Sequence, residues 1–289
     1  MGNCGLFVGL TTLDLIYSVP HLPQSNEKQV AADMAIAAGG PATNAAVTFR
    51  HFDNEAILLG AVGQHPLAGL VRADLAAQRV ELWDLRPEGA DPPPLSSILV
   101  TEQTGDRAVI SRNAVRLQVA ARQIPSDILD GVDIVLIDGH QLEASVAIAK
   151  AAQQQNIPVV LDGGSWKRGL EAVLPFVTYA ICSANFSPPD ALSPSDTIQY
   201  LRETAPIQTI AITHGGDPIR YWTRGETGEI TVPAIQPVDT LGAGDIFHGA
   251  FCHWILRAGF IEALEQASAI AAFACQSFGT RQWLSLIKH

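Results

Sequence analysis

The pattern of apolar and polar residues along this chain alternates between two kinds of segment. Short, almost continuous apolar runs occupy residues 55–63, 133–139, 158–164, 177–183 and 209–215. Helix-forming stretches with interspersed polar residues occupy 67–80, 142–155, 196–205 and 260–278. Apolar strands that alternate with helices are typical of a parallel sheet covered on both faces. The pattern therefore predicts an α/β fold with a doubly wound, mainly parallel sheet.

Two β-rich regions interrupt this alternation. Residues 13–38 have mixed polarity, and residues 95–114 contain two β-rich segments joined by the turn Gln103-Thr104-Gly105-Asp106. A glycine-containing turn between such segments is a hairpin signal. We expect the two regions to pair into a small β-sheet that forms a lid on a single domain spanning residues 1–289. An antiparallel extension of the main sheet is the alternative.

The composition limits the class of protein and its partners. Of the 289 residues, 47% are hydrophobic and 16% are charged, which excludes a disordered chain. The formal net charge of -11 makes nucleic acid and anionic membranes poor partners. No uncharged apolar run approaches the roughly 18 residues of a membrane span. The first basic residue is Lys28, and the four cysteines have no disulfide or zinc spacing, so we expect a cytoplasmic protein.

The strongest local signal is the segment Asp239-Thr240-Leu241-Gly242-Ala243-Gly244-Asp245, which precedes a helix-forming stretch. Small residues at 242–244 permit a sharp turn and leave backbone N–H groups open at a helix N-terminus, where anions bind. Asp245 would repel an anion unless it takes a proton from a nucleophile that attacks the anion. The combination suits phosphoryl transfer, and a helix start capped by Asp245 is the alternative. We expect a bulky residue at Gly244 to crowd the amides and to strain a positive φ.

A second signal is Gly39-Gly40-Pro41-Ala42-Thr43-Asn44. Adjacent glycines let a ligand approach the backbone, Pro41 can open a helix, and Asn44 then offers a donor and an acceptor to a sugar hydroxyl. Two further residues stand at ends of predicted strands. Asn113 can reach a substrate from the lid, and Asp162 can hold Mg²⁺ through water. The alternatives are a plain turn at 39–44, a solvated strand end at Asn113 and loop capping by Asp162.

The two motifs, in this order, resemble the PfkB, or ribokinase-like, family of carbohydrate kinases. The likeness covers almost the whole chain, and the opening Gly9-Leu10-Thr11-Thr12-Leu13-Asp14 is most similar to the ketohexokinase and sulfofructose kinase branch. The resemblance implies a ribokinase-like fold with a β lid, ATP and Mg²⁺ as cofactors, and a sugar as substrate. It leaves dependence on a monovalent cation such as K⁺ open.

The resemblance also implies a role for particular residues. Asp245 matches the catalytic base, with Gly242, Ala243 and Gly244 as the anion hole. Asp14, Gly39, Gly40 and Asn44 match sugar-binding positions. The positions on the nucleotide side are Asn185, Thr213, Gly215 and Gly279. In one departure, the family's Asn-x-x-Glu element begins here with Asn185 but has Pro188 in place of the Glu, so the resemblance does not assign the metal ligands.

The expected function is therefore ATP-dependent phosphorylation of a primary hydroxyl of a small sugar, a ketose of the fructose type. A nucleoside kinase and a catalytically silent ligand sensor on the same fold are the alternatives. A nucleotide-dependent oxidoreductase fits poorly, because no Gly-x-Gly-x-x-Gly follows the first strand. Edge strands of a lid can pair with a second subunit, so a homodimer through the lid is a further expectation.

Overall fold

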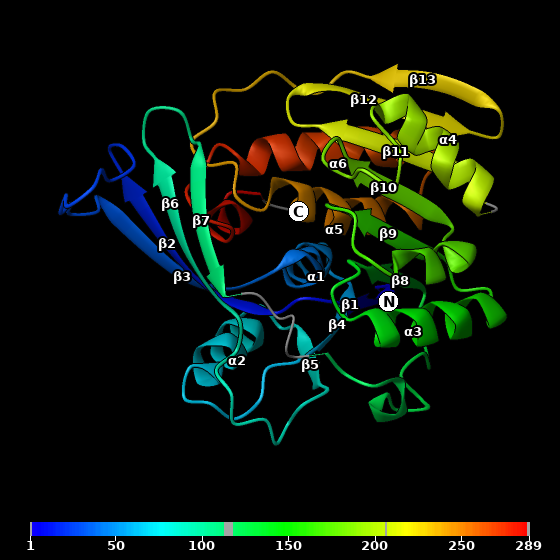
Figure 1. Ribbon diagram of the computed structural model, residues 1–289, viewed down its shortest axis with the longest axis horizontal. Helices are drawn as coiled ribbons and strands as arrows, with labels where there is room; N and C mark the ends of the chain where they lie inside the picture. Colours follow the sequence, from blue (N-terminus) through cyan, green and yellow to red (C-terminus); the bar gives the residue numbers. More distant parts are fainter. Residues whose placement is uncertain (1, 113–117, 206, 288–289) are drawn as a thin grey trace.

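The computed structural model describes residues 2–112, 118–205 and 207–287. Its largest element is a nine-stranded sheet with the order β13-β12-β11-β10-β9-β8-β1-β4-β5 (Figure 1). The strands are β1 Cys4–Val8, β4 Glu55–Gly60, β5 Glu81–Asp84, β8 Ile134–Ile137, β9 Val159–Gly163, β10 Tyr179–Ser183, β11 Thr209–His214, β12 Asp217–Thr223 and β13 Glu226–Ile230. From β5 to β11 all neighbours are parallel, whereas β12 and β13 pair antiparallel. The predicted mainly parallel sheet is confirmed.

Helices cover both faces of this sheet, as the alternation predicts. They are α1 Pro41–His51, α2 Ala68–Ala77, α3 Leu142–Gln154, α4 Pro194–Thr204, α5 Ala243–Ile255 and α6 Phe260–Ala274. Apolar residues of α3 and α4 pack in one core, and those of α1, α2, α5 and α6 pack in a second core on the other face. Because α1 and α5 share that second face, the two glycine-containing motifs that precede them meet at one end of the sheet.

The two β-rich regions form a separate sheet with the order β3-β2-β6-β7, which projects from the body in Figure 1. Its strands are β2 Thr12–Val19, β3 Asp33–Gly39, β6 Leu95–Thr101 and β7 Arg107–Arg112. The hairpin turn lies at the expected place, with Gly105 at φ 68°. Ile16, Ile98 and Val100 on its inner side are buried against Leu241 and Phe278 of the body. The predicted separate lid sheet is confirmed, and the main sheet is not extended by it.

The edges of the main sheet carry little signal in the sequence. The β12–β13 hairpin contains charged and polar residues and lacks a continuous apolar run, so its antiparallel strands do not match the pattern of a buried parallel sheet. β5 at the other edge has four residues, too few for a clear period. Within the described residues, no helix is both long and apolar enough to cross a bilayer.

Candidate active site

The start of α5 forms a turn that exposes backbone amides. Gly242 adopts φ 71°, and a Cβ there would lie 2.9 Å from Cγ2 of Thr280, so glycine is required. The Ile246 N–H donates to the Gly242 carbonyl at 2.8 Å, and the Ala243 N–H donates to the Thr240 carbonyl at 3.3 Å. Among the described residues, the N–H groups of Gly242 and Gly244 have no acceptor. These two amides, at the positive end of the helix dipole, can bind an anion.

Gly244 differs from the expectation for its backbone. Its φ is not positive, and a Cβ built there meets no atom within 4 Å. The expectation of backbone strain at Gly244 is therefore wrong, because the left-handed conformation belongs to Gly242, two residues earlier. A side chain at position 244 would fill open space beside the amides, where an anion would lie.

Asp245 lies in the first turn of α5 and faces the motif on α1. The Asn44 Nδ2 atom donates to its Oδ2 atom at 2.8 Å. Burial, and then the neighbouring Asp162 carboxylate, raise the pKa of Asp245 to about 7, although Asn44 and His248 act in the opposite direction. A carboxyl with a pKa in this range can accept a proton from a hydroxyl near neutral pH.

Asp162 and His248 form a buried pair behind Asp245. Asp162 is the next-to-last residue of β9, its side chain is 5% exposed, and its Oδ2 atom lies 3.6 Å from His248 Nδ1. The His248 ring lies between two carbonyl oxygens, with Nδ1 2.7 Å from that of Gly244 and Nε2 3.1 Å from that of Ile181. Carbonyls only accept hydrogen bonds, so a ring N–H can donate to either of them. Burial raises the pKa of Asp162, and the His248 ring opposes that effect.

Asn44 reaches the site because of the turn before α1. Gly40 adopts φ 98°, and a Cβ there would lie 2.3 Å from the Leu10 carbonyl oxygen. Pro41 opens the helix, and the Asn44 N–H then donates to the Gly40 carbonyl at 2.9 Å. Asn44 is 3% exposed, and its carbonyl Oδ1 accepts from Arg281 at 2.9 Å. No sequence signal pointed to Arg281, because its contacts are made far along the chain.

Asp14 approaches the same site from the lid. It lies on β2, is 6% exposed and accepts a hydrogen bond from the Thr12 hydroxyl at 2.6 Å. Burial raises the pKa of Asp14, while hydrogen bonds from Thr12 and Ser96 and the charge of Arg281 lower it. A Cβ on Gly39 would lie 1.9 Å from the Asp14 carboxylate, so the glycine gives this side chain its space. Asn113, the other residue expected from the lid, lies outside the described residues.

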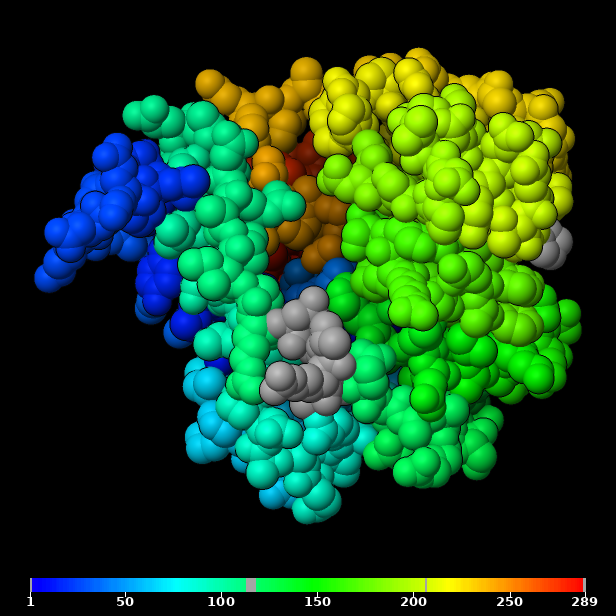
Figure 2. Space-filling model, viewed as in Figure 1, coloured from blue at the N-terminus to red at the C-terminus, as the bar shows by residue number. Residues whose placement is uncertain are grey.

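A hollow separates the lid from the body, and Figure 2 shows it floored by atoms coloured as α5 and α1. The lid tip touches the body at one side of this hollow. The guanidinium of Arg107 donates to the carbonyl and hydroxyl oxygens of Thr240 at 3.0 and 2.9 Å. The Thr240 hydroxyl in turn donates to the Gly105 carbonyl at 3.2 Å. The lid turn is therefore bonded to the segment that precedes the free amides.

The residues expected near a nucleotide fall into two groups. Asn185 is exposed just after β10, and the N–H of its neighbour Ala184 donates to the Thr213 carbonyl at the end of β11. Gly215 follows in the β11–β12 turn with φ 57°. Gly279 instead donates its N–H to Asp239 at 2.8 Å, which ties the C-terminal loop to the segment before α5.

Asp138 has a structural task that its place at the end of β8 did not reveal. Its carboxylate accepts hydrogen bonds from the N–H groups of Leu10, Ala42 and His140 at 2.8 to 3.3 Å. Burial alone would raise its pKa, but His140, the Leu10 amide and the charge of Lys167 hold the pKa of Asp138 at about 2. This carboxylate joins the loop after β1 to the N-terminus of α1 and so supports Asn44.

Asp162 is the residue that best fits a divalent cation. Its buried Oδ2 atom has no hydrogen-bond partner, and carboxylate oxygens are preferred by Mg²⁺. Within the described ranges, no cluster of three or more His, Cys, Asp or Glu side chains can hold a metal. Mg²⁺ at Asp162 would thus take its remaining ligands from phosphate oxygens and water.

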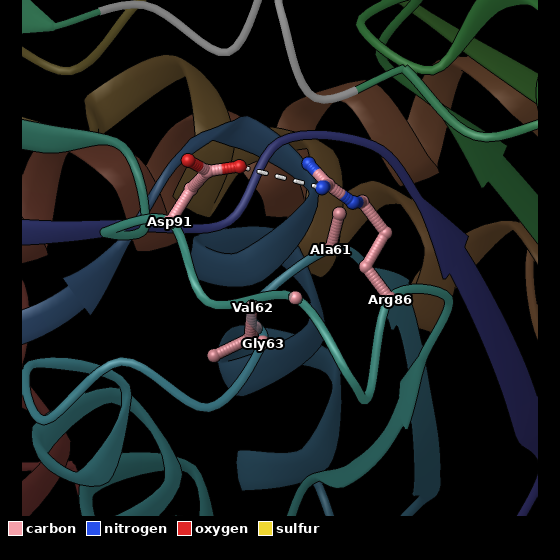
Figure 3. Close-up of a pocket in the computed structure, with 6 residues that line it drawn as sticks. Ala61, Val62, Gly63, Arg86 and Asp91 are labelled. Carbon is pink, nitrogen blue, oxygen red and sulfur yellow. Dashed lines mark hydrogen bonds and ion pairs between the residues drawn. The ribbon is translucent and has the colours of Figure 1, made fainter.

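A second concavity lies beside the loop after β4 and holds no comparable chemistry. Figure 3 shows Arg86 reaching toward Asp91 next to Ala61, Val62 and Gly63. Arg86 and Asp91 form an ion pair at 3.5 Å, and the enclosed space is about 10 Å³. This volume holds at most one water molecule. This concavity is therefore too small for a sugar or a phosphate group.

Comparison with known proteins finds similarity over nearly the whole chain. The model of the pfkB family of carbohydrate kinases matches residues 6–285. An ATP-dependent ribose-1-phosphate kinase of Halopiger xanaduensis is 27% identical, with 96% of this chain and 93% of that protein covered. A deoxyribokinase of Salmonella typhi is 26% identical, with 95% and 93% covered.

Solved structures share the fold. A proposed ribokinase from Agrobacterium tumefaciens superposes with a TM-score of 0.87 at 24% identity, covering 99% of both chains. The ribokinase of Arabidopsis thaliana in complex with ribose and ATP gives 0.77 at 20% identity, covering 100% of both chains. A proposed ribokinase II from E. coli, in complex with ATP and Mg²⁺, gives 0.80 at 18% identity and covers 98% of this chain and 96% of that chain.

Proposed function

Because this chain belongs to the pfkB family of carbohydrate kinases, we propose that it transfers the γ-phosphoryl group of ATP to a primary hydroxyl of a small sugar, with Asp245 as the base. The chain is an ATP-dependent sugar kinase by this membership, and the residue roles are the proposal. The observation that carries them is the contact of Asn44 with Asp245, in the first turn of α5, beside the free amides of Gly242 and Gly244.

Each group in the hollow has a distinct task in the proposed reaction. Asp245 takes the proton of the sugar hydroxyl as that oxygen attacks the phosphorus atom. The amides of Gly242 and Gly244 donate to the oxygens on which negative charge develops. Asp14 and Asn44 accept and donate hydrogen bonds that orient the sugar. The lid excludes water, which would otherwise compete as the nucleophile.

Mg²⁺ would be held by Asp162 together with the phosphates and would neutralise charge on the transferred group. The Oδ2 atom of Asp162, which accepts no hydrogen bond, supports this role. Asn185, Thr213 and Gly215 would contact the nucleotide, and Gly279 would contribute from the C-terminal loop. A dependence on K⁺ is tested by exchanging K⁺ for Na⁺ in the same assay.

For the sugar, we place ribose-type pentoses ahead of the ketose that the sequence suggested. The two relatives named above are kinases of ribose 1-phosphate and deoxyribose. Fructose-type ketoses and nucleosides stay in the panel as alternatives, since a shared fold carries the reaction type better than the substrate.

The test is a coupled assay of ADP release with ribose, 2-deoxyribose, ribose 1-phosphate, fructose and adenosine. We expect ADP release that depends on one of the sugars, with the phosphorylated product seen by mass spectrometry. Turnover only with adenosine would favour the nucleoside kinase. Binding of ATP and sugar without any product would favour the silent sensor.

Two further proposals concern the setting in which the enzyme works. The buried free thiols of Cys182, Cys252 and Cys275 suit the reducing cytoplasm. The outer face of the lid suits a second subunit. In one row across its strands lie Ile36, Leu15 and Ile110, and in the next lie Met34, Tyr17 and Leu99. Exposed apolar faces of this kind mark interaction sites, so a homodimer through the lid is proposed.

A further inference from the structure

Arg281, which the proposed mechanism does not use, lies at the centre of a hydrogen-bond network. Its Nε and Nη2 atoms donate to Oδ2 of Asp74 at 3.3 and 3.2 Å. Nη2 also donates to the carbonyl of Ala38, and Nη1 donates to the carbonyl and hydroxyl oxygens of Thr280 at 3.2 and 3.1 Å. The Arg281 side chain is 17% exposed. This guanidinium is therefore held in one orientation by several elements at once.

The remaining contact of Arg281 is made with the residue that touches the base. Nη1 donates to Oδ1 of Asn44 at 2.9 Å, while the Asn44 Nδ2 atom donates to Asp245 at 2.8 Å. A guanidinium can only donate hydrogen bonds, so it is compatible with only one orientation of the Asn44 amide, in which Oδ1 faces Arg281. In that orientation the NH₂ group faces Asp245. In the reversed orientation the amide oxygen would face the Asp245 carboxylate, and two acceptors would oppose each other.

We propose that Arg281 is a positioning residue, which orients the amide of Asn44 so that its NH₂ group holds the Asp245 carboxylate in place for proton transfer. The inference rests on the proposed role of Asp245. It adds a residue that touches neither substrate nor nucleotide in the proposed mechanism.

The network also connects the base with the lid. Asp74 of α2 accepts a hydrogen bond from the N–H of Ala38 at 2.9 Å, as well as those from Arg281. Ala38 is the next-to-last residue of β3, the lid strand that leads into Gly39 and Gly40. Arg281 thus binds the lid strand end and Asn44 with one rigid group. A lysine keeps the charge but has a single nitrogen, which cannot contact Asp74, Ala38 and Asn44 in this fork geometry.

The chain offers a matched control for this substitution. Arg257 donates to the carbonyl of His253 at 2.8 Å and to Oδ1 of Asn54 at 3.0 Å. It is therefore also an arginine that contacts a buried asparagine and a carbonyl, but it follows the C-terminal end of α5, opposite to Asp245. Arg257→Lys measures the general cost of such a change without touching the proposed base.

The test measures turnover for Arg281→Lys and Arg257→Lys with ATP and the best sugar of the panel. We expect kcat to fall about tenfold in Arg281→Lys, the scale of one lost hydrogen bond to a charged donor, with KM for ATP within about twofold of wild type. Arg257→Lys should keep wild-type kcat. In an Asn44→Ser background, adding Arg281→Lys should lower kcat by less than about twofold relative to Asn44→Ser alone, because the effect of Arg281 passes through Asn44. Equal losses in both backgrounds would overturn the proposal.

A spectroscopic measurement tests the same point without turnover. The side-chain NH₂ signal of Asn44, assigned by its loss in Asn44→Ser, should move in Arg281→Lys and stay in place in Arg257→Lys. An unmoved signal would contradict a positioning role.

Other outcomes separate the two proposals. If Asp245→Asn retains wild-type turnover, the proposed function fails, whatever Arg281→Lys does. If Asp245→Asn is inactive and Arg281→Lys behaves as Arg257→Lys does, only the role of Arg281 fails. Arg281→Gln replaces Arg281→Lys if the latter does not fold. Failure of both to fold, while Arg257→Lys folds, would assign Arg281 a purely structural role.

Discussion

Asp245 shows how one residue can be costly to the fold and useful to the reaction. It is surrounded by Asn44, Asp162 and His248, and its burial and the Asp162 charge raise its pKa to about 7. A carboxylate in this setting is less stable than one in water, so the ionised form of Asp245 destabilises the folded protein. The same setting makes the carboxylate a better proton acceptor near neutral pH.

Asp245→Asn is expected to lower kcat by roughly 10²- to 10⁴-fold, the usual scale for loss of a general base. The amide keeps the size of the side chain but cannot take a proton. KM for the sugar should change much less, because Asp14 and Asn44 remain. The measurement is steady-state kinetics with the sugar identified by the panel, and near-normal turnover would remove Asp245 from the mechanism.

The same variant is expected to be more stable than wild type above neutral pH. A carboxyl whose pKa is raised by folding contributes stability that is complete below its unfolded pKa of about 4 and is lost as pH rises through its folded pKa. The asparagine does not titrate, so the difference in Tm between the two proteins should grow from pH 4 to pH 8. A constant difference in Tm would mean that the pKa of Asp245 is not raised.

The pH dependence of the reaction follows from the same group. With a pKa of about 7 for Asp245, log kcat/KM should rise by about one unit per pH unit below pH 7 and level off above it. Replacing His248 by Gln removes a ring whose charge lowers the pKa of Asp245, so the break in the profile should move to higher pH. A break that stays in place would remove His248 from the electrostatics of the base.

The two glycines of the α5 turn should respond differently to substitution. Gly242→Ala forces a side chain into φ 71° and against Thr280, so we expect a loss of stability of about 1 kcal/mol or more, measured by chemical unfolding. Gly244→Val meets open space, so we expect a folded protein that has lost turnover because the valine occupies the anion position. Circular dichroism must accompany the assay, and normal turnover in Gly244→Val would exclude an anion at these amides.

At the scale of elements, the lid is attached to the body by two contacts that include neighbouring residues of the loop before α5, Thr240 and Leu241. One attachment is the buried contact of Ile16 and Ile98 with the body, and the other is the bond between Arg107 and Thr240 at the tip. Thr240 stands directly before the turn that carries the free amides. Residues 240–242 of one loop therefore join the lid contact at Thr240 to the free amide of Gly242. Closing of the lid is linked through them to the shape of the anion site.

Sugar binding is expected to raise hydrogen-exchange protection in residues 96–112, even without ATP, because closure adds contacts to the lid. The buried strands β8 and β11 should change little. Arg107→Ala should reduce this protection and lower kcat about tenfold, as expected for a lost charged hydrogen bond, whereas Arg220→Ala on the exposed β12 should change neither. Equal protection with and without a verified sugar would mean that the lid is a fixed part of the body.

At the scale of the whole molecule, the proposed homodimer depends on the apolar outer face of the lid. Ile110 is 77% exposed and Met34 is 51% exposed on this face. Ile110→Asp should convert a dimer into a monomer in light scattering, because an ionised carboxylate in an apolar interface is costly. Leu192→Asp is the control, since Leu192 is 95% exposed on a loop away from the lid. A wild-type monomer at micromolar concentration would contradict the proposal.

The sequence by itself determined the parts that depend on short-range pattern. Periods of apolar residues predict the strands and helices, because burial of one face requires the same spacing in any protein. The turns at 39–44 and 239–245 are readable because glycines with positive φ and helix starts have local causes. The choice of Asp245 and Asn44 as candidate site residues and the position of the lid hairpin are therefore predictable from the order of the residues alone.

The tertiary structure decided what joins these parts. Arg281 contacts Asn44 across 237 residues, and Arg107 contacts Thr240 across 133 residues. No local pattern encodes such pairs, because an arginine in a loop has the same neighbours in sequence whether it is solvated or bonded. Asp138 and Asp162 make the same point: both stand at the ends of apolar strands, yet the Asp138 carboxylate accepts several hydrogen bonds and Oδ2 of Asp162 accepts none. Only the packing of α1 and α5 against the sheet assigns these two carboxylates their different environments.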